Sequence, residues 1–260
     1  MLKGMLSAIG IYKIYERWLW HQVKSGTMPK HIAIILDGNR RWASERLLET
    51  WIGHLHGAER VSQLLDWCLD MGVQCVTLYS FSTENFARPP QEVEEIFHIA
   101  EEKLHEILND ERIHKNRIRV KVIGQIGLLP KKLQELIREV EVATKTYDNQ
   151  FLTVALAYGG RAEIVDATKK IAESVKKGEL PIEKINEDVF EKFLYTSHMP
   201  NPDPDLIIRT SGEERLSGFL LWQSAYSELC FLDLFWPDFR RIDLLRAVRT
   251  YQRRKRRFGK

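Results

Sequence analysis

The sequence predicts an α/β fold: a single domain in which a central, mostly parallel sheet of about six strands is flanked by helices. Three observations predict it. Short apolar runs rich in β-branched residues recur along the 260 residues, and stretches with helical periodicity separate most of them. Glycine or proline marks several boundaries, as at Gly72, Pro89 and Pro90. In such sheets ligands bind outside the carboxyl ends of the strands, so a site is expected there.

The first half of the chain supplies two strands and two long helices. The run "HIAIIL" predicts a strand over 31–36, and "CVTLYSF" predicts another over 75–81. Between them a helix is expected over 58–71, where Val61 and Leu64 lie on one apolar face and Gly72 follows as a stop. A long helix begins at the Pro89-Pro90 pair and continues to about residue 113.

The second half continues the alternation. Strands are predicted over 118–124, 151–158, 205–210 and 228–232. Helical periodicity is present over 129–147, 160–178 and 186–197. The segment 198–206 contains three prolines and reads as a loop that leads into the fifth strand.

Composition excludes several classes of protein. The 39 Lys and Arg residues against 36 Asp and Glu leave a net charge of +3, which indicates no nucleic-acid partner. The three cysteines are scattered and form neither a disulfide framework nor a zinc motif, so a cytoplasmic location is expected. No apolar run reaches the ~18 residues of a membrane span. The phosphate-binding P-loop and the dinucleotide fingerprint are both missing from the sequence.

Residues 1–27 form an amphipathic N-terminal segment. Apolar side chains such as Leu6, Ile9 and Trp18 alternate with Lys13, Arg17 and other basic residues. Such a segment either packs on its own domain or contacts a membrane surface or an apolar ligand.

The first strand is followed by charged residues, which a buried strand does not need. Asp37, Gly38 and Asn39 form a turn, and Arg40 and Arg41 follow it. A carboxylate repels phosphate unless a divalent cation such as Mg²⁺ bridges them, whereas arginines bind phosphate directly. The alternative is that the Asp-Gly turn only caps a helix.

Two further strand exits are rich in hydrogen-bonding groups. Residues 80–88 concentrate hydroxyl, amide and carboxyl groups, and residues 209–217 contain two arginines and two serines, a composition that suits a diphosphate. Ordinary polar loops are the alternative at both places. Glu228 lies among apolar residues, and a carboxylate in such surroundings is usually paired or bound to metal.

Six motifs in series resemble the cis-prenyltransferases, the undecaprenyl and polyprenyl diphosphate synthase family. They are "DGNRRWA", "GHLHGAERV", "LYSFSTENFARPPQEV", "AYGGRAEI", "DLIIRTSGEERLSGFLLWQSAYSEL" and the closing "RRFGK", in order from about residue 28 to the end. The variant "DGNRRWA" and the N-terminal segment look most like archaeal-type members.

The resemblance implies a Mg²⁺-dependent, homodimeric prenyltransferase with its catalytic domain over 28–260. Such an enzyme adds isopentenyl diphosphate units in cis to an allylic diphosphate primer, here geranylgeranyl or farnesyl diphosphate. The expected product is a long-chain precursor of a glycosyl carrier lipid, such as undecaprenyl diphosphate.

Carried over residue by residue, the family's motifs also imply roles. Asp37 would be the catalytic carboxylate and a Mg²⁺ ligand, with Glu228 completing the metal site. Asn85 is the position assigned to proton removal, with a substrate phosphate oxygen as the alternative. The substrate-binding residues implied are Gly38, Asn39, Arg40, Arg41, Trp42, His54, Ser82, Thr83, Glu84, Phe86, Arg88, Arg209, Arg215, Leu216 and Ser217.

A long product implies an apolar tunnel or contact with lipid, because each buried CH₂ contributes roughly 0.8 kcal/mol. The helix after Pro90 offers one wall through Val93, Ile96 and Leu104, although the same stripe also suits an ordinary core. Because of this resemblance, a role as a tunnel lid or a peripheral membrane contact is favoured for the N-terminal segment. Residues 257–259 match the family's terminal R-x-G, which reaches the partner subunit.

The sequence departs from many bacterial members at three positions. Arg40 stands where they have Gly, Phe86 where they have Trp, and Thr50 where they have a basic residue. These differences put individual substrate contacts in question. The rival interpretations are a non-catalytic subunit of the same fold, a nucleic-acid-binding protein with a basic tail, and a metal-dependent phosphatase.

Overall fold

The computed structural model describes residues 10–254, which contain one six-stranded sheet with every neighbouring pair parallel. The strands lie in the order β3-β4-β2-β1-β5-β6. Their bounds are β1 His31–Ile35, β2 Cys75–Ser82, β3 Ile118–Ile123, β4 Gln150–Tyr158, β5 Leu206–Arg209 and β6 Glu228–Phe231. The predicted fold class is confirmed, and each predicted strand is found with its ends within one residue.

The helices follow the predicted alternation. Their bounds are α2 Ile11–Val23, α3 Asn39–Glu45, α4 Thr50–Asp70, α5 Pro90–Asn109, α6 Glu111–Lys115, α7 Lys131–Ala143, α8 Gly160–Lys176, α9 Glu187–Glu191 and α10 Arg241–Arg253, with a short 3₁₀ helix η1 at Thr83–Ala87 and another, η4, at Trp236–Asp238. The helix predicted over 186–197 ends early, at Glu191. The helix predicted to start at residue 58 starts instead at Thr50.

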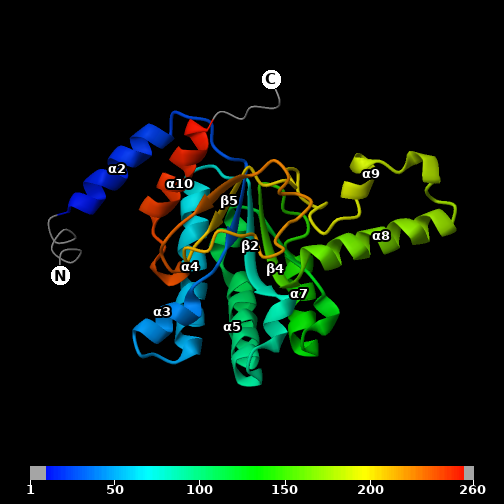
Figure 1. Ribbon diagram of the computed structural model, residues 1–260, viewed down its shortest axis with the longest axis horizontal. Helices are drawn as coiled ribbons and strands as arrows, with labels where there is room; N and C mark the ends of the chain where they lie inside the picture. Colours follow the sequence, from blue (N-terminus) through cyan, green and yellow to red (C-terminus); the bar gives the residue numbers. More distant parts are fainter. Residues whose placement is uncertain (1–9, 255–260) are drawn as a thin grey trace.

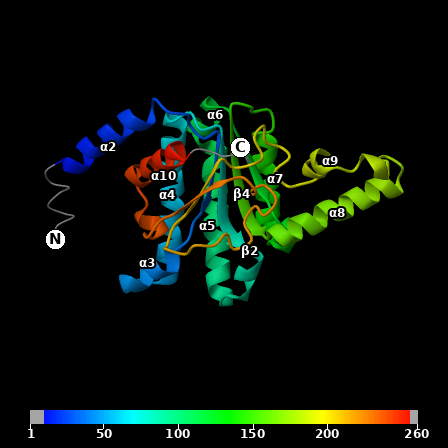
Figure 2. The same ribbon diagram turned by 45° about the horizontal axis from the view of Figure 1, so that its top comes forward.

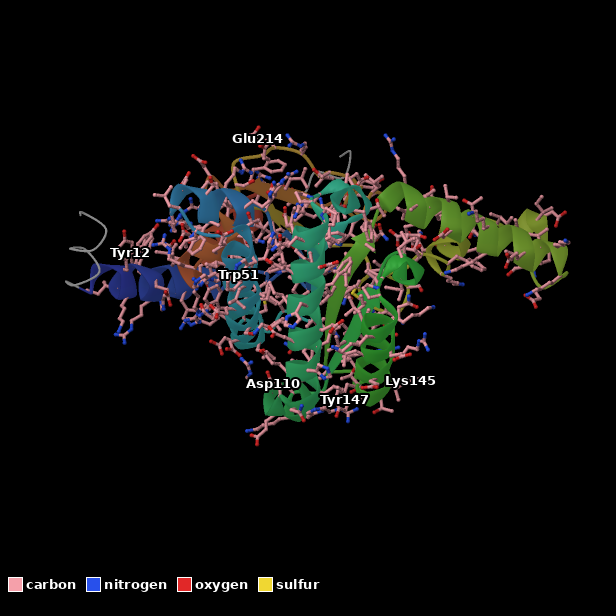
Figure 3. All side chains as sticks on the ribbon, turned by 90° about the horizontal axis from the view of Figure 1, so that it is seen from below. Tyr12, Trp51, Asp110, Lys145, Tyr147 and Glu214 are labelled. Atoms are coloured by element: carbon pink, nitrogen blue, oxygen red, sulfur yellow. The ribbon has the colours of Figure 1, made fainter. Side chains whose placement is uncertain are left out.

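One face of the sheet is covered by helices. Alternate strand residues such as Ile32, Ile34 and Leu78 point into a core that α4, α5, α7 and α10 complete. Figures 1 and 2 show α4 and α5 side by side along this face, with α10 beside α4. Seen from below in Figure 3, Glu214 and Asp110, which directly follows α5, lie toward opposite ends of the molecule.

The opposite face is covered mainly by irregular chain. Phe219 and Leu220, in the segment between β5 and β6, are fully buried against it. The Phe219 ring stacks on Tyr79 with centroids 4.7 Å apart and an interplanar angle of 9°. Helices α8 and α9 extend from this side away from the body (Figure 1). Their departure leaves the β5–β6 segment to cover the centre of this face.

The N-terminal helix α2 packs on its own domain, the first of the two alternatives. Leu19 and Val23 are fully buried in the main core. Four aromatic side chains of α2 lie under arginines: Tyr12 under Arg240, Tyr15 under Arg246, Trp18 under Arg249 and Trp20 under Arg241, at 5.2–5.9 Å. Its outer side leaves Ile14 67% and Trp18 49% exposed. Residues 1–9, the rest of the segment, lie outside the described part.

No helix within residues 10–254 has the length and apolar character needed to cross a membrane.

A fully buried histidine, His31, and a partly buried one, His198, lie at the sheet's second face. His31 is fully buried, and its Nε2 is 2.8 Å from Thr77 Oγ1. His198 Nδ1 is 3.1 Å from the Tyr195 carbonyl oxygen, to which it must donate, so its Nε2 accepts from Thr153 Oγ1 at 3.0 Å. Burial lowers the pKa of each imidazole to about 4.

We expect the free energy of unfolding to fall as the pH is lowered from 7 to 5. Both histidines stay neutral when folded but take up a proton near pH 6.5 when unfolded, so acid favours the unfolded chain. The slope should approach about 1.4 kcal/mol per pH unit for each histidine. Urea unfolding at pH 7, 6 and 5 measures the free energy of unfolding and hence this slope. His198→Gln should reduce the slope, whereas His98→Gln, on an exposed side chain, should not; a flat profile would contradict the assignment.

Candidate active site at the carboxyl edge of the sheet

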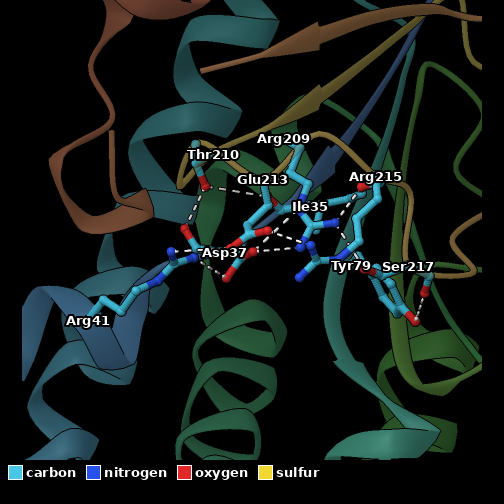
Figure 4. Close-up of polar contacts among 9 residues, drawn as sticks. All are labelled: Ile35, Asp37, Arg41, Tyr79, Arg209, Thr210, Glu213, Arg215 and Ser217. Atoms are coloured by element: carbon cyan, nitrogen blue, oxygen red, sulfur yellow. Dashed lines mark hydrogen bonds and ion pairs between the residues drawn. The ribbon is translucent and has the colours of Figure 1, made fainter. Parts of the chain in front are cut away.

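Asp37, two residues beyond β1, is the centre of a polar cluster at the carboxyl edge of the sheet (Figure 4). Arg209, the last residue of β5, lies 2.7 Å from Asp37 Oδ2 through Nη2, and its side chain is only 6% exposed. Arg41 Nη2 lies 3.5 Å from Asp37 Oδ1. Thr210 Oγ1 donates to the Asp37 carbonyl at 2.6 Å. The ends of β1 and β5 are therefore joined through one carboxylate.

The arginines keep Asp37 ionised. Burial by itself would raise the pKa of the Asp37 carboxyl, but the hydrogen bond from Arg209 and the charges of Arg209 and Arg41 outweigh it, so its pKa lies below the ordinary value. Within residues 10–254 the ion pair of Oδ1 is with the more distant Arg41, at 3.5 Å, so this oxygen can accept a further ligand.

Arg209 also holds the segment that follows it. Its Nη1 donates to Ser217 Oγ at 2.9 Å and to the carbonyl of Arg215. Ser211 and Ser217 have φ values of 84° and 49°, in the left-handed region that non-glycine residues rarely adopt. Glu213 lies between two arginines: it accepts from Arg215 at 2.5 Å and from Arg41 at 3.5 Å. The 211–217 segment is thus tied back over Asp37.

Close glycine contacts fix the turn that carries Asp37. Gly38 has a φ of 108°, and a Cβ there would lie 2.8 Å from the Phe235 ring. A Cβ on Gly53 or Gly57 of α4 would lie 2.2 Å or 2.5 Å from atoms of Asn39. The two glycines of the "GHLHG" motif therefore let α3 pack directly against α4. This packing brings His54, which lies between them in the motif, to the site.

Glu92, in the first turn of α5, is a hub that the sequence prediction missed. Its carboxylate is almost buried, and Oε1 contacts two arginines and a histidine: Arg88 Nη1 at 3.1 Å, His54 Nε2 at 3.2 Å and Arg40 Nε at 3.5 Å. Burial lowers the pKa of His54 below 6.5, while the bond to Glu92 opposes this shift. The spacing Arg88 to Glu92, one helical turn, was the available signal.

These side chains surround a polar cavity of about 480 Å³. Its lining is Leu36, Asp37, Gly38, Asn39, Arg40, Arg41, Ser44, Thr50, His54, Ser80 and Arg88. Three arginines and a histidine against one lining carboxylate make it a site for a polyanion. Six predicted substrate-binding residues, Gly38, Asn39, Arg40, Arg41, His54 and Arg88, come together here.

A second, apolar cavity of about 160 Å³ adjoins the first. Leu36, Asn39, His54 and Ser80 line both. From there the apolar cavity runs between α4, α5 and the sheet, past Val61, Ile96, Ala100, Leu104 and Leu156. The pairing of β2 with β4 shifts register between Tyr79 and Phe81. This irregularity lets both Ser80 and Phe81 face the helices, so a hydroxyl stands where the two cavities meet.

Several predicted residues take other places. Trp42 is buried and donates from Nε1 to Asp238 Oδ1 at 3.0 Å, so its ring packs behind α3. Ser82, Thr83, Glu84 and Phe86 belong to η1 and its cap, which does not line either cavity; Phe86 packs edge-on against Phe81 at 5.0 Å. Leu216 packs against the core of the second face.

Asn85 has a structural bond of its own. Its Oδ1 accepts from the backbone N–H of Ser82 at 3.1 Å, as in a capping box. The oxygen that proton removal would need is thus already engaged; the catalytic role of Asn85 stays a prediction.

Glu228 is not brought to Asp37 within one chain. It starts β6 and pairs with Leu206, which pairs with Ile32 at the start of β1. Asp37 follows the other end of β1. Along the strand direction, Glu228 therefore lies about 10 Å from the end of β1, and the turn to Asp37 adds to this separation. Glu228 Oε2 instead accepts from Arg254 at 2.9 Å. The expected pairing of Asp37 with Glu228 around one metal ion is absent from the single described chain.

The Asp37 end of the site fits a hard cation all the same. Mg²⁺ is commonly bound by one or two carboxylates while substrate phosphates and water supply its other ligands. Asp37 Oδ1 is such a donor, and Asn39 Oδ1, nearby in the chain, is buried without a hydrogen-bond partner. Within residues 10–254 no group of three or more His, Cys, Asp and Glu side chains forms a complete metal cage.

Known proteins share both sequence and fold with this chain. The model of the undecaprenyl diphosphate synthase family matches residues 35–259. A Methanocaldococcus jannaschii protein named tritrans,polycis-undecaprenyl-diphosphate synthase (geranylgeranyl-diphosphate specific) is 54% identical over 251 residues, which are 96% of this chain and 90% of the relative. A Pyrococcus abyssi protein of the same name is 48% identical over the full length of both chains.

Solved structures agree. Lavandulyl diphosphate synthase from Lavandula x intermedia, in complex with dimethylallyl diphosphate, superposes with a TM-score of 0.86 and 36% identity over 90% of this chain and 99% of that one. A probable undecaprenyl diphosphate synthase from Campylobacter jejuni superposes with a TM-score of 0.72 and 31% identity, over 90% of this chain and 100% of that one. The chain belongs to the undecaprenyl diphosphate synthase family, which confirms the resemblance found in its motifs, archaeal-type members included.

We expect Glu92→Gln to lower the pKa of His54 further. The Glu92 carboxylate favours the protonated imidazole by charge and hydrogen bonding, and the variant loses the charge. An NMR titration of the histidine ring protons measures this pKa. Glu102→Gln, which removes the partner of the exposed His98 on the same helix, is the matched control and should leave the His54 curve unchanged. A rise in the His54 pKa would overturn the proposed contact.

Proposed function

We propose that this chain catalyses the sequential cis-condensation of isopentenyl diphosphate onto an allylic diphosphate primer, giving a long-chain polyprenyl diphosphate such as undecaprenyl diphosphate, the precursor of a glycosyl carrier lipid. The observation that carries the proposal is the junction of the two cavities: a cationic cavity at Asp37 opens past Ser80 into an apolar one. This matches the two halves of a prenyl diphosphate.

The residues of the polar cavity suit the departure of diphosphate. Breaking the allylic C–O bond puts negative charge on the leaving group, and Arg40, Arg41 and Arg88 are already fixed around the cavity to stabilise it. When bound at Asp37, Mg²⁺ would add a divalent positive charge to the same group. Arg209, Arg215 and Ser217, on the neighbouring strand exit, would hold the second diphosphate; the hydrogen bond from Arg209 to Ser217 supports this.

The end of each cycle requires loss of a proton from the isopentenyl unit. Asn85 Oδ1 already accepts a backbone hydrogen bond, and an amide is a weak base. We therefore assign the proton to a phosphate oxygen of the substrate. Asn85 then acts by holding the 82–87 turn.

Geranylgeranyl diphosphate is the primer we favour over farnesyl diphosphate. The relatives from Methanocaldococcus jannaschii and Pyrococcus abyssi, which this chain matches over at least 96% of its length, carry geranylgeranyl-diphosphate specificity in their names.

The active form is proposed to be a homodimer in which Glu228 acts on the partner's site. Glu228 and Asp37 lie toward opposite edges of the parallel sheet, so a second copy is the way to bring them to one cation. Exposed apolar side chains on the β5–β6 segment and α8, such as Leu221 at 37% and Val165 at 51%, offer a surface for that copy. A peripheral membrane contact through the exposed Ile14 and Trp18 of α2 is proposed as well.

Replacement of Asp37 should abolish chain growth. Asp37→Asn keeps the shape but loses the charge, and we expect product formation to fall at least about 100-fold, as for loss of one transition-state contact. The assay uses labelled isopentenyl diphosphate with geranyl, farnesyl and geranylgeranyl diphosphates offered separately, with Mg²⁺ and with excess EDTA. Removing Mg²⁺ should stop growth with every primer.

A matched control keeps that test interpretable. Asp148→Asn removes a carboxylate that pairs with Arg117 on the surface, and it should leave activity unchanged. Thermal unfolding of Asp37→Asn must also be followed, because Arg209 would lose its buried partner. Release of inorganic phosphate without chain growth in the wild type would favour a phosphatase instead.

Mixed dimers test the role of Glu228. Co-expressed Asp37→Asn and Glu228→Gln chains should recover about a quarter of the wild-type activity if Glu228 serves the partner's site, because one site of each mixed dimer is then intact. Each variant alone should be inactive. If Glu228 served its own chain, no mixed dimer would hold an intact site, and the mixture would stay inactive.

A further inference from the structure

The far end of the apolar cavity is lined by charged side chains. Lys103 and Glu106 of α5, Asp110 after it and Arg112 of α6 line the cavity beside the apolar Ile107 and Ile113. His54 and Ser80 mark the end at the diphosphate site. From Ile96 to Asp110 the chain of α5 advances about 21 Å. The cavity thus begins at a polar site and ends at another, unrelated polar group.

Arg112 spans this end between two elements. Its Nη1 donates to both carboxylate oxygens of Asp66 on α4, at 2.8 Å and 3.0 Å. Its Nη2 and Nε donate to Asp110 at 2.6 Å and 3.0 Å. Asp110 is itself fixed as the N-cap of α6, since it accepts from the Arg112 backbone N–H at 2.8 Å. The guanidinium is held from both sides and ties α4 to the start of α6.

This triad has no role at the diphosphate site. Asp66 and Arg112 are each 47% exposed, and the structure gives them no contact with any residue of the polar cavity. An exposed ion pair of this kind contributes little to stability. The Lys103–Glu106 pair also lines this end of the cavity, but both of its members belong to α5. The triad differs because it joins α4 to α6 across the far end of the cavity.

An apolar chain that grows along the cavity meets the triad when the apolar lining ends. Each added unit up to that point removes apolar surface from water, which is favourable. The next unit would have to lie against these hydrated charges, so it would gain less from burial and would strip water from them. Growth beyond the triad therefore has an added barrier, and release of the product competes with it.

We propose that Asp66, Arg112 and Asp110 form a latch across the far end of the apolar cavity and set the number of isoprene units in the released product. The inference rests on the proposed prenyl-elongating function and deepens it, by assigning length specificity to a particular group of side chains. Arg112 is the central member, because it alone contacts both carboxylates.

The test is the product-length distribution of latch variants. Purified full-length protein is given Mg²⁺, geranylgeranyl diphosphate and labelled isopentenyl diphosphate, and the chains are separated by length. Arg112→Ala should shift the most abundant product upward by at least one C₅ unit. Asp66→Ala should give a smaller shift in the same direction, and the double variant should match Arg112→Ala, since both remove one latch.

Arg117→Ala is the matched control. Arg117 lies five residues after Arg112 in the chain, is 50% exposed and pairs with Asp148 at 2.9 Å. It does not line the cavity. Its products should have wild-type lengths. The rate of the first condensation, which occurs at the other end of the cavity, should be unchanged within twofold in all these variants. Arg112→Lys, which keeps the charge but cannot span both carboxylates, serves if the alanine variant does not fold.

The outcomes separate the latch from the proposed function. A wild type that makes no chains from any primer overturns the function on which the latch rests. A wild type that elongates, with Arg112→Ala or Arg112→Lys giving the same lengths, overturns the latch alone. A length shift that the Arg117→Ala control shares would also overturn it, because loss of any nearby ion pair would then be enough.

Discussion

The ion pair between Asp37 and Arg209 is the constraint on which the site depends. It joins the ends of two neighbouring parallel strands, and one buried guanidinium serves both the Asp37 carboxylate and the 215–217 segment. A buried arginine needs such partners, because an unpaired charge there would be costly. Each partner is therefore needed by the other, and the pair, by lowering the pKa of Asp37, keeps its charge available for a cation.

Glu92, on the other side of the polar cavity, is a second carboxylate that holds several side chains in place. One nearly buried carboxylate orients Arg40, Arg88 and His54, which come from three different helices or turns. The positive charge that would face a diphosphate in the proposed function is thus fixed in place before a ligand arrives. Preorganised charges of this kind need not rearrange when the leaving group becomes negative, which is the usual source of electrostatic catalysis.

The sheet connects the two chemistries of the site. Because the six strands of residues 10–254 are parallel, polar turns gather at one edge, while the sheet face toward α4 and α5 stays apolar. A cavity between the sheet and α4 and α5 therefore changes from cationic to apolar within a few residues. The β2 irregularity at Ser80 lies at that change. An amphiphilic ligand fits this gradient better than a purely polar one would.

The sequence by itself determined the strands, their mostly parallel arrangement and most of the residues that line the polar cavity, because hydrophobic periodicity and short motifs such as "DGNRRWA" are local properties of the chain. Tertiary structure alone decided which side chains meet. It revealed the Glu92 hub, placed Trp42 against Asp238 and engaged Asn85 with Ser82. It also separated Glu228 from Asp37, because β6 runs parallel to β5 and β1, which puts the first residue of β6 and the residue after β1 at opposite edges of the sheet, and no local motif encodes the direction in which two distant strands pair.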